Sequence, residues 1–255
     1  MNNTKHLRLF CVSDLHLGTE RGQTERLLRQ VRAAAPDLIL IVGDLMTAKL
    51  PESQKPAGIL LISLAKVAPV ILSLGNHEQK WPEVTASWRR LSGVTVLDNE
   101  KLDFRWGEQH LMITGLTLPE DHFKRIRRPS LTMKELYQCI GRRQPADFHI
   151  LMAHHPAYSR QYRQWGANLI VSGHYHGGLV RLPLLGGLLS PQLVPFPHFS
   201  KGTYRSNGRL HVVMAGAGEH TGIPRLGNPK EVLLVDLIKS AGRIGIGKIE
   251  RWESR

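Results

Sequence analysis

The sequence predicts an α/β fold in which helices connect buried, largely parallel strands. Two observations support this prediction. Residues 7–12, 37–42 and 69–74 are short apolar runs rich in leucine and β-branched residues, a composition typical of buried parallel strands. Residues 24–34 and 56–67 lie between these runs and place apolar side chains at helical spacing. This alternation of strand and helix is characteristic of layered folds with crossover helices.

The rest of the chain predicts further strands and helices in the same domain. Strand-like runs occur at 94–106, 109–118, 147–156, 168–173, 209–216, 231–237 and 243–250. A polar, basic segment at 119–130 precedes a predicted helix at 131–141. The sequence has no internal repeat, low-complexity tract or clear linker. We therefore predict a single domain over residues 1–255, with two sheets packed between helices.

Composition and charge favour a folded protein with anionic partners. The 255 residues are 42% hydrophobic and 22% charged, which is typical of a globular domain. The net charge is +13, of which residues 101–255 carry +11 and residues 1–100 carry +2. Such a basic excess favours phosphorylated substrates, nucleic acid or acidic lipid surfaces, and composition does not choose among them.

The sequence predicts neither a disulfide framework nor a membrane span. Cys11 and Cys139 lie far apart, which favours a reducing compartment. The apolar stretch near the start is short and contains Arg8, so no signal peptide is predicted. The apolar segments 59–75 and 179–196 are interrupted by charged residues and prolines. We expect a cytoplasmic protein, with peripheral contact to acidic membrane lipid as an alternative.

Polar side chains suited to metal binding follow five of the predicted strands. They are Asp14 and His16, Asp44, Asn76 and His77, His154 and His155, and His174 and His176. Because the carboxyl ends of parallel strands form the ligand crevice of such folds, these side chains should converge on one rim. Carboxylate and neutral imidazole suit Mn, Fe or Zn, and one carboxylate can bridge two metals about 3.5–4 Å apart. The pattern therefore predicts a metal site.

The order of these motifs, D-x-H, G-D, G-N-H-E, H and G-H-x-H, resembles the calcineurin-like metallophosphoesterase family over residues 9 to about 180. The resemblance implies a four-layer α/β/β/α sandwich with a dinuclear metal site. The implied ligands are Asp14, His16 and His176 for one metal, Asn76, His154 and His174 for the second, and Asp44 as the bridge. The implied cofactors are two divalent ions, with Mn preferred and Fe or Zn as alternatives.

The resemblance also implies roles for residues beside the metals. His77 is similar to the family's catalytic histidine, which would stabilise the phosphoryl charge or protonate the leaving group. Glu78 stands where aspartate is more frequent, and it would orient His77 through a hydrogen bond. We read His155 as an additional histidine and not as a ligand. The implied reaction is hydrolysis of a phosphate ester by in-line attack of a metal-bound hydroxide.

Residues 172–183, the apolar loop that follows them and residues 222–237 are similar to the YkuE-type bacterial branch of this family, which is related to enzymes that cleave UDP-2,3-diacylglucosamine. The similarity suggests a lipid-linked or nucleotide-linked substrate. Arg225 would be either a contact to substrate phosphate or a surface residue. The apolar loop 179–199 would either pack on the sheet or touch lipid. The basic run 124–128 would be either a solvated face or a surface that attracts anionic substrate or acidic lipid.

We therefore expect a dinuclear metal-dependent phosphoesterase that acts on an anionic, phosphorylated substrate. The alternatives are a UDP-2,3-diacylglucosamine-type pyrophosphate hydrolase, a nuclease and a non-catalytic metal-binding scaffold. A nuclease is disfavoured because no stripe of aromatic and basic residues is present, and no specific nucleic-acid partner is predicted. A scaffold is disfavoured because all seven ligand positions and His77 are present. The sequence leaves the oligomeric state open.

Overall fold

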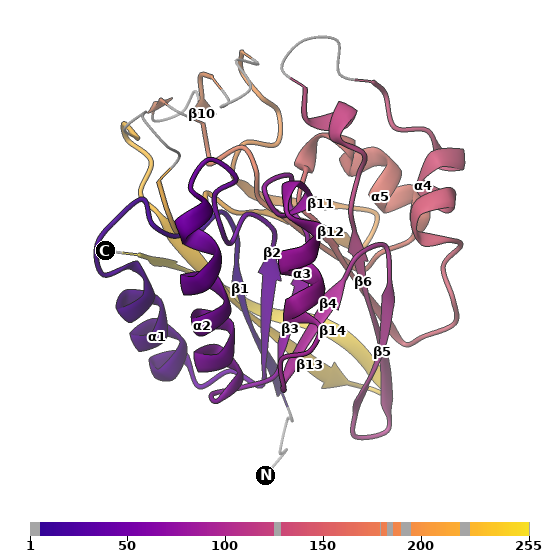
Figure 1. The fold of residues 1–255 in the computed structure, drawn as a ribbon. Coiled ribbons are helices and arrows are strands. Elements are labelled where there is room, and N and C mark those ends of the chain that lie inside the picture. Colours follow the sequence, from indigo (N-terminus) through magenta and orange to yellow (C-terminus); the bar gives the residue numbers. More distant parts are fainter. Residues whose placement is uncertain are drawn as a thin grey trace.

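Two six-stranded sheets form the centre of the computed structural model (Figure 1). The structure describes residues 6–124, 129–178, 180–182, 186–189, 195–219 and 225–254. The strand order is β14-β13-β1-β2-β3-β4 in the first sheet and β11-β12-β8-β7-β6-β5 in the second. A small hairpin of β9 (Arg181–Leu182) and β10 (Gly186–Gly187) lies outside these two sheets.

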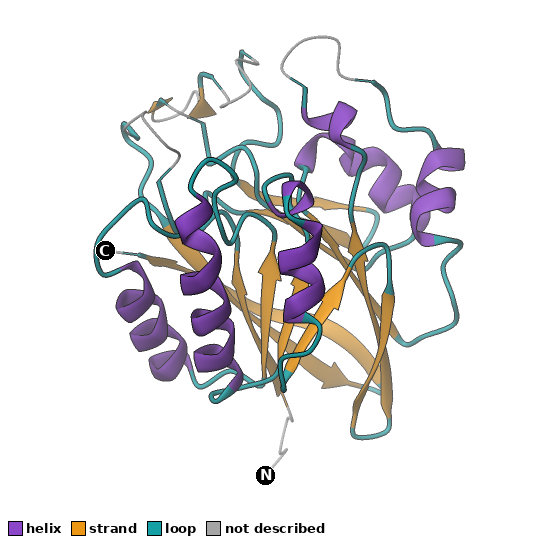
Figure 2. Ribbon diagram, viewed as in Figure 1, coloured by secondary structure: helices purple, strands orange, loops and turns teal. Residues whose placement is uncertain are grey.

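The first sheet is parallel at its centre. Its strands are β1 (His6–Val12), β2 (Leu38–Val42), β3 (Val70–Ser73), β4 (Val94–Leu97), β13 (Glu231–Ser240) and β14 (Arg243–Glu253). Neighbouring strands from β1 to β4 pair in parallel, whereas β13 pairs antiparallel with both β1 and β14. The helices α1 (Gln23–Ala34), α2 (Gln54–Ala65) and α3 (Pro82–Trp88) connect the parallel strands and cover the outer face (Figure 2).

The second sheet also has parallel strands at its centre. Its strands are β5 (Lys101–Trp106), β6 (Gln109–Leu116), β7 (Phe148–Ala153), β8 (Leu169–Ser172), β11 (Gly202–Ser206) and β12 (Arg209–Val213). The edge strands β5 and β11 pair antiparallel with their neighbours. The helices α4 (Met133–Ile140) and α5 (Ser159–Trp165) pack on the outer face through side chains such as Leu136 and Tyr162.

An apolar layer joins the two sheets. In β1, Leu9 and Cys11 face this layer, where they pack with Ile150 of the second sheet. Phe10 and Val12 of the same strand point the other way and pack beneath the helices. This alternation is the period of two that a strand imposes on its side chains. The predicted four-layer α/β/β/α sandwich is confirmed.

One predicted strand is divided between the two sheets. The run 94–106 forms β4 in the first sheet and β5 in the second, with the crossing at residues 98–100. Asn99 has φ 56° there, a left-handed conformation that asparagine tolerates better than most residues, so the chain can turn sharply. The predicted helix at 131–141 begins two residues later, at Met133, because Thr132 and Glu135 form a capping box.

Two predictions fall largely outside the described residues. Of the basic run 124–128, only Lys124 is described, and it follows a short 3₁₀ helix at Glu120–Phe123. Much of the apolar loop 179–199 is likewise not described. Their contacts with substrate or lipid stay predictions. Within the described part of the chain, the helices are too short or too polar to cross a bilayer.

A buried polar chain links α5, β12 and β8 beneath the rim of the second sheet. His211 is 0% exposed, and its two ring nitrogens lie 2.7 Å from Ser159 Oγ and 2.9 Å from Ser172 Oγ. Ser172 donates its proton to the carbonyl of Ala153 at 2.6 Å, so it accepts from His211 Nε2. Burial together with the charge of Arg163 lowers the pKa of His211 to about 3, so the ring is neutral at pH 7 and carries its proton on Nε2.

Acid is expected to destabilise the protein through His211. Its pKa in the unfolded chain is near 6.5, so only the unfolded state gains a proton as pH falls from about 6.5 toward 3. At pH 5 the resulting loss is about 2 kcal/mol relative to pH 7. Urea unfolding of the wild type and His211→Gln at both pH values checks this. The variant should lose less stability between them, and identical losses would contradict the assignment.

Candidate metal centre

The side chains predicted as ligands lie at one rim of the sandwich, where strands of both sheets end. They follow β1 (Asp14, His16), β2 (Asp44) and β3 (Asn76) in the first sheet, and β7 (His154) and β8 (His174, His176) in the second. The sandwich therefore places together side chains that are far apart in the sequence, as the strand-end pattern predicts.

Five of these residues have a left-handed backbone. Asp14, His16, Asp44, His174 and His176 have φ values between 47° and 68°. Residues other than glycine rarely adopt this conformation, because the Cβ atom crowds the neighbouring carbonyl oxygen. Such strain persists only where the surrounding structure holds it, and it concentrates at functional sites. The loops after β1, β2 and β8 are therefore shaped to present these side chains.

Asp14, His16 and His176 form the first group of possible ligands. Their nearest ligand atoms lie within 4.8 Å of one another, and all three residues are buried. The Nε2 atoms of His16 and His176 are 3.2 Å apart, and His176 Nε2 is 3.5 Å from Asp14 Oδ1. A carboxylate oxygen and two imidazole nitrogens facing one point suit a divalent cation such as Mn, Fe or Zn.

Asp44, His154 and His174 form a second group of the same kind. His154 Nε2 lies 3.1 Å from Asp44 Oδ2, while its Nδ1 is 2.8 Å from the carbonyl oxygen of Val42. Donation from Nδ1 to that carbonyl leaves Nε2 directed at the group, which is how ligand histidines are usually oriented. The side-chain oxygen of Asn76 is buried and accepts no hydrogen bond from any described residue. Such an oxygen fits a cation ligand.

Asp44 also belongs to a third group, with His16 and His77. The backbone N–H of Ala48 donates to His77 Nδ1 at 2.8 Å. The proton of the neutral ring therefore lies on Nε2, which is 3.9 Å from Asp44 Oδ2. His77 is thus placed beside the other groups with a donor directed at them, and its side chain is 14% exposed.

The buried carboxylates set the charge of the centre. Burial would raise the pKa of Asp44, but the neighbouring His154 holds that pKa well below its usual range. Burial opposes protonation of His154, yet the charges of Asp44 and Asp14 raise the pKa of His154 to about 10. A metal ion that binds His154 must therefore displace a proton, so metal affinity should rise with pH.

Glycines leave the space that the two carboxylates occupy. A Cβ atom at Gly75 would lie 2.2 Å from Asp44 Oδ1, and one at Gly173 would lie 2.2 Å from Asp14 Oδ2. Both contacts are far inside van der Waals distance. The glycines of the G-N-H-E and G-H-x-H motifs are therefore needed for close approach of the backbone to these side chains.

Glu78 joins the loops that carry the carboxylate and the asparagine. Its fully buried carboxylate accepts from the backbone N–H groups of Asp44 at 2.8 Å, Gly75 at 2.9 Å and Met46 at 3.2 Å. The sequence predicts a hydrogen bond from Glu78 to His77, but the structure gives Glu78 these backbone partners and gives His77 Nδ1 the N–H of Ala48. Glu78 thus positions the loops and not the histidine ring.

Replacing Glu78 with glutamine is expected to weaken metal binding about 10–100-fold, the usual effect of losing a supporting group. An amide has one accepting oxygen, so at least one of the three backbone donors loses its partner and the loops after β2 and β3 loosen. Titration of the metal-free protein with Mn checks this. Glu83→Gln, the same change at an exposed residue of α3, is the matched control and should leave the affinity unchanged. An unchanged affinity in Glu78→Gln would contradict the role.

His155 lies beside the centre but outside the three groups. Its Nδ1 accepts from the backbone N–H of Ala157 at 3.2 Å, which caps the short 3₁₀ helix at Pro156–Tyr158. Its ring packs against Tyr158, Tyr175 and His174. These contacts support reading His154, and not His155, as the ligand.

Arg225 lies against the centre from the side of the C-terminal segments. Its guanidinium donates to the carbonyls of Ala215, Gly216 and Gly218, and Nη2 is 3.0 Å from His176 Nδ1. Its side chain is only 5% exposed. These contacts favour a role in holding the 215–218 segment against His176, and a contact to substrate phosphate stays a prediction.

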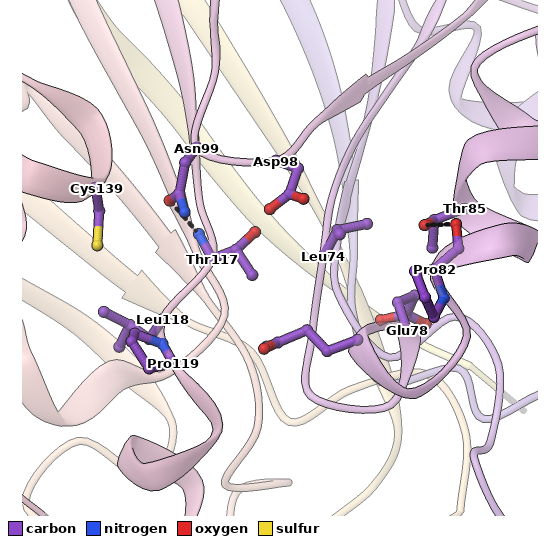
Figure 3. Close-up of a pocket in the computed structure, with 11 residues that line it drawn as sticks. Leu74, Glu78, Pro82, Thr85, Asp98, Asn99, Thr117, Leu118, Pro119 and Cys139 are labelled. Atoms are coloured by element: carbon purple, nitrogen blue, oxygen red, sulfur yellow. Dashed lines mark hydrogen bonds between the residues drawn. The ribbon is translucent and has the colours of Figure 1, made fainter.

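Sequence reasoning missed Phe123 and the cavities beside the centre. The Phe123 ring lies 5.1 Å from the ring of His174, 5.3 Å from that of His155 and 6.2 Å from that of His154. A single phenylalanine inside the polar segment 119–130 was the available signal. A cavity of about 320 Å³ opens next to Glu78 between the loops after β3, β4 and β6 (Figure 3).

A family model and several relatives match this chain. The model of the calcineurin-like phosphoesterase family matches residues 7–178, so the chain belongs to that family. This membership classes the domain as a metal-dependent phosphoester hydrolase. A transmembrane protein with a metallophosphoesterase domain from Danio rerio is 27% identical over 89% of the chain and 52% of its own length. The phosphodiesterase YaeI of Escherichia coli is 26% identical over 80% of the chain and 71% of its own length.

A solved structure supports the fold independently. A dimetal phosphatase from Danio rerio superimposes with a TM-score of 0.54 over 98% of this chain and 99% of that one, at 10% identity. This likeness shows the sandwich fold alone. The chain spans about half the length of several of the curated relatives that it matches, such as the Danio rerio transmembrane protein.

Proposed function

We propose that this domain hydrolyses phosphate esters with two divalent ions held by the seven predicted ligands. The observation that carries the proposal is that the three groups share members, since His16 and Asp44 each belong to two of them. Two ions held by these groups would therefore lie close together. The proposed ligands are Asp14, His16 and His176 for one ion, Asn76, His154 and His174 for the other, and Asp44 as the bridge.

The donor set supports the proposed cofactors. It combines two carboxylates, one amide oxygen and four imidazoles, which suits Mn, Fe or Zn and not Mg or Ca, which prefer oxygen ligands. We propose Mn as the first metal to test. When bound, two such ions would supply Lewis-acid polarisation of the phosphoryl group and an activated water.

The residues of the chain would place and stabilise the reacting group. His77 directs Nε2–H toward the centre, where it can donate to a phosphoryl oxygen as negative charge develops. Protonation of the leaving group is the less favoured role, because an imidazolium would need a second ring proton at Nδ1, where Ala48 already donates. Glu78 and Arg225 would hold the loops that carry Asp44 and His176.

Metal-dependent hydrolysis by the purified protein tests the proposal. The protein is stripped of metal and reloaded with Mn, Fe or Zn. It is then assayed on p-nitrophenyl phosphate, bis-p-nitrophenyl phosphate, UDP-2,3-diacylglucosamine and single-stranded DNA. The name of the Escherichia coli relative supports a diester as the first substrate to test. Turnover should occur only in the loaded protein, and no turnover on any substrate with two ions bound would overturn the proposal.

A further inference from the structure

Two cavities lie beside the metal centre along residues 74–82 and 117–124, and together they are called the groove. The first has a volume of about 250 Å³ and is lined by Asn76, Lys80, Glu120, Asp121, Phe123 and Lys124. The second, of about 320 Å³, is lined by Gln79 and Pro119, which are next in sequence to residues of the first, and by residues of other segments such as Asn99 and Cys139. Figure 3 shows this second cavity. The first cavity reaches a proposed metal ligand, Asn76.

Phe123 forms the aromatic wall at the inner end of this groove. Its ring contacts the rings of His154 and His174, which are proposed ligands of the second ion. It also lines the first cavity together with Asn76. A group attached to a phosphate at the centre would therefore meet the Phe123 ring as soon as it extends into the groove.

The charged side chains of the first cavity compensate one another. Lys80 Nζ lies 2.5 Å from Glu120, and Lys124 Nζ lies 2.6 Å from Asp121. The two lysines are thus paired with two carboxylates, and the cavity carries no net charge from them. A second anionic group on the substrate would meet the carboxylate of each pair as well as its lysine, whereas a neutral group would meet no such repulsion.

The second cavity is lined in part by uncharged polar side chains, among them Asn99 and Thr117, whereas the first is lined by ion pairs. Thr117 lines the cavity, but its Oγ1 is buried, so the polar side chain that it shares the cavity with, Asn99, supplies the contact. Asn99 Oδ1 accepts from the N–H of Thr117 at 2.9 Å, which leaves the Asn99 amide nitrogen as a donor. Figure 3 shows both side chains and Asp98 around this cavity. The groove therefore has room and polar contacts for a leaving group larger than one ring.

We propose that this groove is the leaving-group subsite, and that Phe123 selects phosphate esters whose leaving group carries a neutral, planar ring next to the phosphate. This inference rests on the proposed function, because it assumes that the phosphoryl group binds at the metal centre. Aromatic rings pack against Phe123 in offset or edge-to-face geometry, and such contacts favour an aromatic ligand over an aliphatic one.

Binding of phosphonates to the Mn-loaded protein tests this subsite without catalysis. Phenylphosphonate and methylphosphonate carry the same anionic group, and only the first has a ring. Calorimetry on the wild type should give a Kd about tenfold lower for phenylphosphonate. In Phe123→Ala the two Kd values should become equal through a weaker phenylphosphonate affinity, and Phe123→Tyr should keep the preference. Phe123→Leu retains an apolar side chain but has no ring, so it should lose most of the preference for phenylphosphonate.

The outcomes separate this inference from the proposed function. If neither phosphonate binds the wild type at millimolar concentration, the phosphoryl site itself is absent and both proposals fall. Equal Kd values of the two phosphonates for the wild type would overturn only the proposed subsite. The subsite would also be overturned if Phe123→Ala weakened the binding of both phosphonates by the same factor, because Phe123 would then act only by packing against the histidines. The Mn content and the methylphosphonate Kd of each variant establish which case holds.

Discussion

Replacing Asp44 with asparagine is expected to abolish the dinuclear centre and to lower kcat/KM by at least about 1000-fold. Loss of a single charge-stabilising donor already costs about 100–1000-fold in other enzymes, and here the proposed bridge between two ions is removed. Asparagine keeps the volume of aspartate but replaces one accepting oxygen with an NH₂ group, which cannot bind a cation. Elemental analysis after loading with Mn should find one ion or fewer per chain.

A matched variant lies at the other end of the same strand. Asp37 immediately precedes β2, is exposed, and accepts from the backbone N–H of Arg8 at 2.7 Å. Asp37→Asn should keep two ions and wild-type turnover. A second readout concerns the metal-free protein, in which Asp44→Asn should lower the pKa of His154 from about 10, because the nearest charge that raises it is gone. Retention of two ions by Asp44→Asn would overturn the bridging role.

The sequence predicts which side chains lie together at the rim, because each proposed ligand stands at the end of a strand that the apolar pattern already marks. Asp14 follows the apolar run 7–12, and Asp44 follows the run 37–42. The position of each residue in the sequence therefore predicts that it lies at the carboxyl end of a strand. The same reasoning predicts the layers, since the period of two in β1 is visible in its residues. The prediction is weaker at residues 94–106, where the chain passes from one sheet to the other. The turn is made at Asn99, and the strands on either side of it have the same apolar pattern.

The supporting contacts could not be predicted in the same way, because their partners are backbone groups. The N–H of Ala48 holds His77, yet no residue type marks a backbone donor in a sequence. Glu78 accepts from N–H groups in two loops, and only their folded geometry brings these loops together. Arg225 is similar, since the carbonyls that it contacts come from a segment whose position depends on β12 and β13.

His77→Ala is the second change expected to have a large effect, a loss of about 100–1000-fold in kcat with both ions retained. The ring contributes one N–H directed at the centre, and the Ala48 N–H fixes which nitrogen carries the proton. Because this donor would act on a phosphoryl oxygen, the loss should be similar for aryl esters with good leaving groups and for alkyl esters with poor ones. Parallel kcat measurements on both classes, with metal content, check this.

The dependence on the leaving group decides which role His77 has. If His77 gave its proton to the departing oxygen, His77→Ala would harm alkyl esters far more than p-nitrophenyl esters, because only a poor leaving group needs protonation. That outcome would contradict the neutral-donor role and would require Ala48 to release Nδ1 during turnover. His110→Ala is a matched control, because that histidine lies on β6, has a 21% exposed side chain and pairs with Asp103 at 2.9 Å. It should leave both classes of ester unaffected, so a loss confined to His77→Ala reports the ring at the centre and not the removal of an imidazole.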